Sequence, residues 1–124
     1  MTTDELTATI SDMYRSLGDR PAFDAHLHPD LTIWESDADH LLRGLADLHA
    51  LRDRRAAEAA GPAPLTVAPE QLHADCWGDT GVVRYVLRAR HGGDRPDSCF
   101  RVTDVLRRAG TGWRIVHHHA EAMR

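Results

Sequence analysis

Two carboxylate side chains occupy positions where the surrounding pattern is apolar. Side chains of the segment 99–107 alternate between two faces, and Asp104 is the only charged residue on the face that is otherwise apolar. Glu35 continues the apolar face of the shorter segment 31–35 in the same way. Burying an ionised carboxylate without a partner is costly, so Asp104 should bind a donor, stay protonated or face a cavity. In a shared dry pocket the two carboxylates could form an acid–base pair, one accepting a proton while the other donates to a developing oxyanion.

Two arginines offer a structural alternative to this chemistry. Arg84 and Arg88 share one face of the segment 82–90 and could form salt bridges with Glu35 and Asp104. The opposite face of the same segment is apolar. Hydrophobicity alone therefore places that face in the interior and the two arginines in solvent.

A run of three histidines near the end of the chain suggests a metal site. His117 and His119 are expected to share a strand face with Trp113, and imidazoles two residues apart on a strand can ligate one ion. His26 and His28 could add to the ligand set, but they are expected at a helix end, where this spacing points them apart. No Cys or carboxylate follows at a ligand spacing. We therefore predict no metal site, and we expect His117 and His119 at a dimer surface.

Other side chains are candidates for the wall of a pocket. His118 is expected to share a face with Val116 and to point into the pocket, where a neutral imidazole could shuttle protons or orient Asp104. Trp34 is expected to form pocket wall rather than to stack on a cofactor. Tyr14 either reaches the pocket from the first helix or covers the core with its hydroxyl group in water.

Start and stop signals predict three helices that would position these side chains. Residues 2–17 carry a candidate capping box and an apolar stripe at helical spacing, followed by a glycine. A short second helix, capped by Asp19, is expected to run to Leu27 and to stop at Pro29. A third, amphipathic helix is expected over residues 45–60.

Alternating patterns and turn signals predict an antiparallel sheet in the second half of the chain. The expected strands are 31–35, 65–77, 82–90, 99–107 and 113–120, the last two joined in a hairpin by a glycine-containing connector. Helices followed by antiparallel strands indicate an α+β fold, with the helices on one face of a curved sheet. A chain of 124 residues can build one core but not two, so we predict a single domain, 1–124.

Composition excludes several classes of function. The net charge is −4 and the arginines are scattered, which argues against nucleic-acid binding. All 15 basic residues are Arg, and the absence of Lys excludes a Schiff-base lysine, anchored pyridoxal phosphate and a Walker-type phosphate loop. We therefore expect no cofactor. Two separated cysteines, with no signal peptide and no apolar run that could span a bilayer, predict a cytoplasmic protein without a membrane partner.

Several stretches, taken together, resemble one superfamily. The helical start, the strand ending in Trp34-Glu35, and the final DVLRRAGTGWRIVHHHAE are similar in order and spacing to the nuclear-transport-factor-2-like superfamily, particularly its SnoaL-like branch. The resemblance covers nearly the whole chain. It implies a cone-shaped α+β half-barrel of a curved, mostly antiparallel sheet, whose N-terminal helices pack on the concave face around a small-molecule pocket. Members usually pair through the convex face, which implies a homodimer.

The resemblance to ketosteroid isomerase concerns the two carboxylates. In that enzyme a general-base Asp follows a strand that resembles residues 31–34, and Glu35 occupies the matching position here. The enzyme also keeps a protonated Asp as an oxyanion donor in a stretch similar to the one around Asp104. Its first-helix Tyr aligns near Ser11, and Tyr14 lies one turn away, so this chain departs from the full oxyanion hole. A polyketide-cyclase-like or dehydratase-like reaction fits this departure better than steroid isomerisation.

A second branch of the superfamily implies a different function. The association domain of calcium/calmodulin-dependent protein kinase II is similar to this chain in PDLTIWES, GLADLHALRDRR and WRIVHHHAE. Arginines face the pocket of that domain, and one of them matches Arg88, which implies that Arg88 faces the pocket here. Another matches Asp104, where this chain carries a carboxylate. Such domains assemble and bind ligands, so a non-catalytic ligand-binding or oligomerisation domain is the alternative hypothesis.

These observations lead to one principal functional hypothesis. The chain is expected to be a small cofactor-independent acid–base enzyme, of cyclase, isomerase, dehydratase or hydrolase type, acting on a hydrophobic small molecule. The expected catalytic residues are Glu35, Asp104 and His118, and the expected ligand-binding residues are Tyr14, Trp34, Arg88 and Val116.

Overall fold

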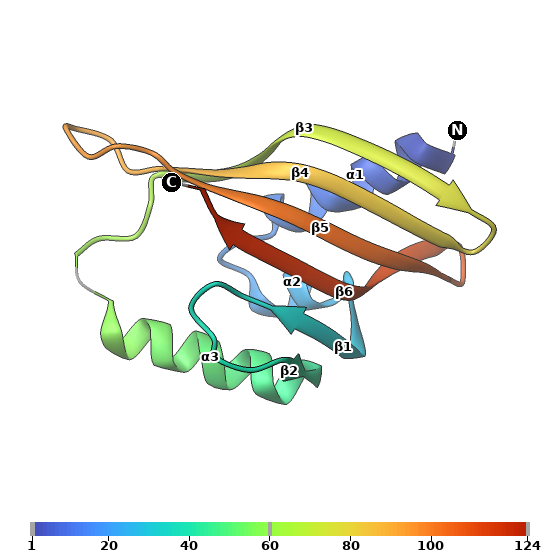
Figure 1. The fold of residues 1–124 in the computed structure, drawn as a ribbon, viewed down its shortest axis with the longest axis horizontal. Coiled ribbons are helices and arrows are strands. Elements are labelled where there is room, and N and C mark those ends of the chain that lie inside the picture. Colours follow the sequence, from blue (N-terminus) through green and yellow to red (C-terminus); the bar gives the residue numbers. More distant parts are fainter. Residues whose placement is uncertain (1, 60, 124) are drawn as a thin grey trace.

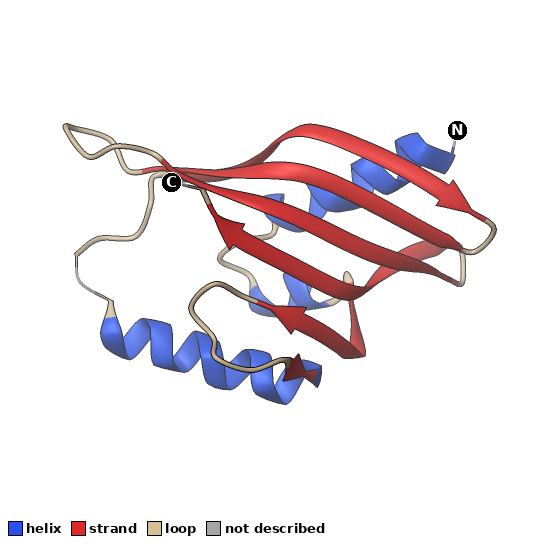
Figure 2. Cartoon of the chain, viewed as in Figure 1, coloured by secondary structure: helices blue, strands red, loops and turns tan. Residues whose placement is uncertain are grey.

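A six-stranded sheet curves around the helices in the computed structural model (Figure 1), which describes residues 2–59 and 61–123. Helices α1 (Thr2–Arg15), α2 (Arg20–Asp24) and α3 (Gly44–Glu58) lie in the first half of the chain. The strands are β1 (Leu27–Trp34), β2 (Leu42–Arg43), β3 (Thr66–Trp77), β4 (Thr80–Arg90), β5 (Ser98–Ala109) and β6 (Gly112–Ala122). This arrangement confirms the expected α+β fold, whose sheet is open rather than closed into a barrel (Figure 2).

The sheet is mostly antiparallel. Its strand order is β2-β1-β6-β5-β4-β3, and among the strands of the described residues only β1 and β6 run parallel to each other. The predicted hairpin of the last two strands is present, because β5 pairs with β6 over almost its whole length. As a result, the strand that carries Asp104 lies at the centre of the sheet, between β4 and β6.

The start of β1 differs from the sequence expectation. Helix α2 begins after the predicted cap, Asp19, whose side chain accepts a hydrogen bond from the backbone of Ala22, but the helix ends at Asp24. The expectation of a helix to Leu27 that stops at Pro29 is wrong, since both residues belong to β1. The β1–β6 pairing is interrupted between Leu27 and Thr32, which leaves room for a proline that has no N–H to donate.

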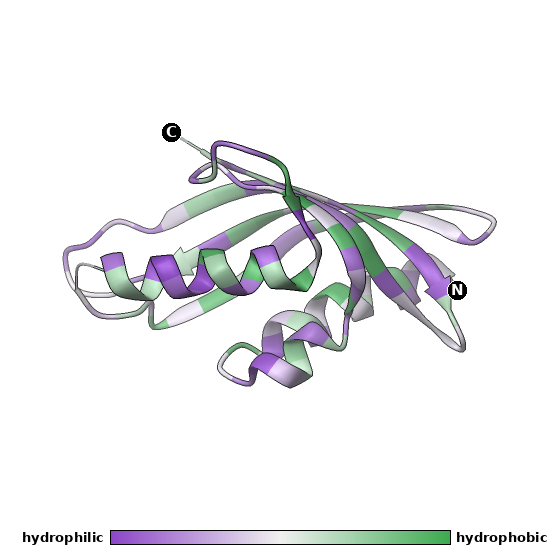
Figure 3. Cartoon of the chain, turned by 90° about the horizontal axis from the view of Figure 1, so that it is seen from below, coloured by the Kyte–Doolittle hydropathy of each residue, from purple (hydrophilic) through white to green (hydrophobic). Residues whose placement is uncertain are grey.

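Helices α1 and α3 close the concave side of the sheet. Leu6, Ile10 and Met13 of α1 are buried, whereas the last residue of the predicted stripe, Leu17, is 48% exposed. Helix α3 carries both hydrophobic and hydrophilic residues along its length (Figure 3), and its residues Leu48 and Leu51 are buried. It begins one residue before its expected start, and Ala60, the last residue of the predicted helix, lies outside the described residues.

Two local features shape the sheet. A β-bulge in β3 between Glu70 and His73, with Gln71 at a φ of 56°, bends this edge strand, as bulges do. At the start of β4, a Cβ on Gly81 would lie 2.6 Å from the buried side chain of Leu6. A glycine is therefore required where α1 crosses β4. Within residues 2–59 and 61–123, no helix has the length and apolar character needed to cross a membrane.

Candidate functional site

A cavity of about 620 Å³ opens between the concave face of the sheet and the helices. Its walls are largely apolar and come from α1, α2, α3 and five of the strands. The polar side chains in its lining include Tyr14, Glu35, Arg52, Arg55 and His118. Ionisable groups that share a mostly apolar cavity interact strongly, because little water screens them.

Asp104 is fully buried beside this cavity, at 0% exposure, and does not line it. Its Oδ1 accepts a hydrogen bond from Nδ1 of His118 at 2.5 Å, and its Oδ2 accepts one from the hydroxyl of Tyr85 at 2.6 Å. Of the three outcomes expected for a buried carboxylate, the structure shows the first, a carboxylate that has found donors. The alternative of a salt bridge from Asp104 to Arg84 or Arg88 is wrong.

The two tyrosines form a short relay behind the carboxylate. The hydroxyls of Tyr14 and Tyr85 lie 2.9 Å apart. Because the single proton of Tyr85 goes to Asp104, Tyr14 donates to Tyr85. Burial and the negative charge of Asp104 raise the pKa of both phenols well above their usual value. Both tyrosines are therefore neutral donors, and the proton of Tyr14 is already engaged.

His118 connects Asp104 with the cavity. Its Nδ1–H points at Asp104, which turns Nε2 toward the cavity and toward Glu35, whose Oε1 lies 3.6 Å away. Burial opposes the charged form of His118. The negative charge of Asp104, the hydrogen bond that Asp104 accepts from His118 and the negative charge of Glu35 together outweigh this effect of burial. The pKa of His118 is therefore raised above its usual 6.5. An imidazolium held between two carboxylates can donate a proton from Nε2 to a ligand in the cavity.

Glu35 follows directly after β1, and its side chain is 15% exposed. Its Oε2 lies 3.4 Å from the guanidinium of Arg55 on α3. Arg55 is itself held by Asp37, through two hydrogen bonds of 2.8 and 2.7 Å. Arg55 therefore holds Glu35 at its Oε2 atom. The other oxygen of Glu35, Oε1, faces His118 and the cavity.

Four of the predicted site residues therefore come together. Tyr14, Glu35 and His118 line the cavity, and Asp104 stands directly behind His118. In this arrangement Glu35 can accept a proton from a bound ligand while His118 donates one. Asp104 holds the imidazole in the orientation that points Nε2 at the ligand.

Val116 does not line the cavity, contrary to expectation. Val105 pairs with His117 and Leu106 pairs with Ile115, so Val116 is the extra residue of a β-bulge in β6. The bulge reverses the alternation, which places Ile115 and His118 on the same, inner face. The expectation that His117 and His119 share a face with Trp113 is wrong for the same reason.

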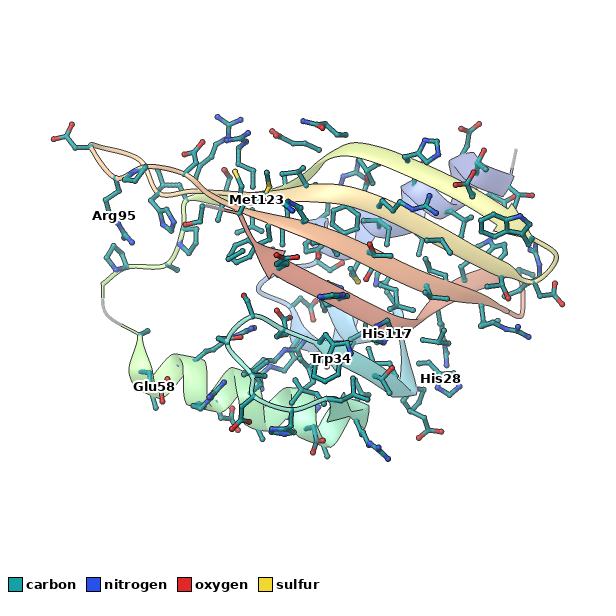
Figure 4. The ribbon with its side chains drawn as sticks, in the orientation of Figure 1. His28, Trp34, Glu58, Arg95, His117 and Met123 are labelled. Carbon is teal, nitrogen blue, oxygen red and sulfur yellow. The ribbon has the colours of Figure 1, made fainter. Side chains whose placement is uncertain are left out.

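Trp34 and Arg88 lie on the outer face of the sheet, so the expectation that they bind ligand in the cavity is wrong. Trp34 is 43% exposed and belongs to β1, which pairs with the strand that carries His117. Figure 4 shows the side chains of Trp34 and His117 on the outside of the sheet. Arg88 donates hydrogen bonds to Glu70 at 2.9 Å and to Asp97 at 3.2 Å. The apolar face of β4 is the inner one, as hydrophobicity alone indicates.

The outer histidines have other partners. His117 shares a 2.7 Å hydrogen bond with the hydroxyl of Thr32. The pKa of His117 is lowered, mainly by burial and to a smaller extent by the charges of the neighbouring histidines. His119 is exposed. Among residues 2–59 and 61–123, no group of three or more His, Cys, Asp or Glu side chains is arranged to hold a metal ion.

Sequence reasoning missed two residues of the site, Tyr85 and Arg55. Tyr85 lies on the apolar face of β4, and its register partner, Val102, is two residues from Asp104 on β5. This diagonal placement on one face was a usable signal. Arg55 lies at helical spacing on the apolar side of α3, as the charged residue in an otherwise apolar row. Glu35 occupies the same kind of position at the end of the apolar row of β1, so the same signal could have identified Arg55.

Comparisons with known proteins agree with this architecture. A family model described as a SnoaL-like domain matches residues 5–123. A search of curated proteins found no match. Among solved structures, the S. rosetta CaMKII hub is 19% identical, with a TM-score of 0.83 over 99% of this chain and 98% of that one.

Two further solved structures carry the names of enzymes. A putative dehydratase of the NTF2-like family from Streptomyces avermitilis is 16% identical, with a TM-score of 0.75 over 99% of this chain and 96% of that one. A putative ketosteroid isomerase from Parabacteroides distasonis is 16% identical, with a TM-score of 0.67 over 98% of this chain and 84% of that one. These similarities confirm the expected nuclear-transport-factor-2-like fold, and at such identities they show the fold alone.

Proposed function

The chain belongs to the SnoaL-like domain family, and on that premise we propose that it is a cofactor-independent acid–base enzyme for a hydrophobic small molecule. One observation carries the proposal. A carboxylate, Glu35, and an imidazole of raised pKa, His118, face the same largely apolar cavity with 3.6 Å between them. Acid and base groups in close proximity, with unlike environments, are typical of sites that move protons.

The geometry assigns complementary roles to the two groups. Glu35 accepts a proton from an acidic carbon of the ligand, and Nε2–H of His118 donates to the oxygen on which negative charge develops. Asp104 stabilises the imidazolium, and Tyr85 fixes the other oxygen of Asp104. Return of the proton from Glu35 to a different atom of the ligand gives isomerisation, whereas loss of a protonated hydroxyl gives dehydration.

This scheme fits the isomerase, cyclase, dehydratase and hydrolase types, since all of them need proton transfer and oxyanion stabilisation. The names of the solved relatives, a putative dehydratase and a putative ketosteroid isomerase, support the same class of chemistry. We propose no cofactor, because both proton-transfer groups belong to the chain itself.

A generic carbon acid tests the proposed function before the substrate is identified. In the Kemp elimination of 5-nitrobenzisoxazole, a base removes the proton from the ring carbon, the N–O bond breaks and a coloured cyanonitrophenolate leaves. We expect saturable catalysis well above that of free acetate at the same concentration, because an apolar cavity desolvates the carboxylate. Catalysis no greater than that of free acetate would contradict the proposal.

The S. rosetta CaMKII hub supports an alternative function. Its name and its TM-score of 0.83 favour a non-catalytic ligand-binding or oligomerisation domain, in which the cavity holds a ligand without turning it over. We propose a homodimer that pairs through the outer face of the sheet, where the large side chain of Trp34 is exposed. Measurement of the mass in solution tests this alternative, because a large ring favours assembly whereas a dimer is compatible with both functions.

A further inference from the structure

The Glu35–His118 pair retains hydrogen-bonding capacity toward the cavity. The 3.6 Å between Nε2 of His118 and Oε1 of Glu35 exceeds the length of a hydrogen bond. In the part of the chain that the structure describes, the closer partner of Glu35 is Arg55, which lies at its other oxygen. One donor and one acceptor therefore stand side by side at the cavity wall, each able to take a ligand atom.

The other cations of the cavity wall are already neutralised. Arg52 donates two hydrogen bonds, of 3.0 and 2.7 Å, to the carboxylate of Asp24. Arg55 donates two to Asp37, of 2.8 and 2.7 Å. Among the described residues of the site, four carboxylates, those of Asp24, Glu35, Asp37 and Asp104, thus surround three cationic side chains, so none of these cations is left without a carboxylate partner for an anionic ligand to neutralise.

From this arrangement we propose that the cavity selects hydrophobic ligands that present a hydroxyl group to Glu35 and His118, over ligands of the same size that present a carboxylate or an ammonium group. A hydroxyl both donates and accepts, so it can donate to Oε1 of Glu35 and accept from Nε2 of His118. An oxygen at about 2.8 Å from each of these atoms fits a pair separated by this distance.

Charged ligand groups lack this double match. A carboxylate only accepts, and it meets the negative charge of Glu35. An ammonium only donates, and it meets the positive charge of His118. A like charge placed against an ionised group in a poorly solvated site weakens binding. The inference rests on the proposed function, since it names the ligand class of the same site: neutral hydrophobic alcohols or hydroxyketones.

Three ligands with one carbon skeleton test the selectivity. Binding of 4-phenylbutan-1-ol, 4-phenylbutanoate and 4-phenylbutylammonium to the wild-type protein is measured by calorimetry at neutral pH. We expect the alcohol to bind at least about tenfold more tightly than either ion, because only the ions face a like charge. Equal affinities, preference for an ion, or no measurable binding of the alcohol would overturn the inference.

A charge variant separates specific recognition from general hydrophobic preference. In Glu35→Gln the group that repels the carboxylate is neutral, so 4-phenylbutanoate should gain affinity relative to the alcohol by about tenfold. The matched control, Glu70→Gln, removes a carboxylate that binds Arg88 away from the cavity and should leave the ratio unchanged. A ratio that stays the same in Glu35→Gln would show that the cavity selects by hydrophobicity alone, which contradicts the inference.

The binding measurements and the Kemp elimination, carried out on the same protein preparations, distinguish failure of this inference from failure of the proposed function. If catalysis of the Kemp elimination depends on Glu35 but the alcohol is not preferred, the inference fails and the proposed function stands. If the alcohol is preferred and Glu35→Gln changes the ratio, but no catalysis is found, the ligand class stands and the proposed function fails.

Discussion

Replacing Glu35 by glutamine should lower the rate of the Kemp elimination by about 10²–10⁴-fold, the usual contribution of a positioned general base. Glutamine has nearly the size of glutamate and can still accept a hydrogen bond from Arg55, but it cannot take up a proton from carbon. The initial rate of phenolate release, measured under saturating probe, gives the effect on kcat directly.

Two controls make this loss interpretable. Glu70→Gln removes a carboxylate of the same type whose partners, Arg88 and Arg90, lie outside the cavity wall, and it should keep the wild-type rate. Denaturant unfolding should show that Glu35→Gln remains folded, since Glu35 lies at the end of a strand and keeps a partial exposure to water. A folded Glu35→Gln protein with the wild-type rate would end the assignment of Glu35 as the base.

Replacing Asp104 by asparagine should destabilise the fold by roughly 3 kcal/mol, near the lower end of the cost of removing one partner of a buried ion pair. Asparagine presents one acceptor oxygen where the carboxylate presents two, so Nδ1–H of His118 and the hydroxyl of Tyr85 can no longer both donate to this side chain. The cost lies near the lower end because His118 can release its proton. Urea denaturation at pH 6 measures the difference in the free energy of unfolding.

The destabilisation by Asp104→Asn should depend on pH in a defined direction. Because Asp104 and Glu35 raise the pKa of His118 in the fold, the stabilisation from its charged form is fully present below about pH 6.5. It is lost as the pH rises through the pKa of the folded state. The difference in the free energy of unfolding between wild type and Asp104→Asn should therefore become smaller above that pKa. The control variant Asp97→Asn removes a surface partner of Arg88 and should show no such pH dependence. If the difference in unfolding free energy caused by Asp104→Asn does not change with pH, the ion pair between Asp104 and His118 is contradicted.

Patterning predicted the long helices and strands well, because each of them repeats its pattern over many residues, whereas the two-residue β2 was not predicted. The hairpin of β5 and β6 follows from two alternating segments that flank a glycine turn, and the alternation in β5 placed Asp104 on the inner face. The apolar stripe of α1 likewise predicted its buried side, since Leu6, Ile10 and Met13 recur at helical spacing.

Local irregularities account for the errors at the site. A single bulged residue, Val116, changes which neighbours of His118 face inward, and alternation carries no sign of where a bulge occurs. The arginine match to kinase association domains placed Arg88 in the cavity, whereas the apolar face of its own strand indicated the opposite. At such low similarity, side-chain direction follows this chain's own burial pattern rather than that of its relatives.

The titration of His118 tests the central claim most directly, since the account depends on a charged imidazole coupled to Glu35 across one cavity. Nuclear magnetic resonance of the imidazole nitrogens of His118 gives its pKa in the wild type and in Glu35→Gln. We expect a wild-type pKa above 6.5, and a lower value in Glu35→Gln because one of the two carboxylates that favour the imidazolium is neutral. A wild-type pKa at or below 6.5, or the same pKa in both proteins, would contradict the account.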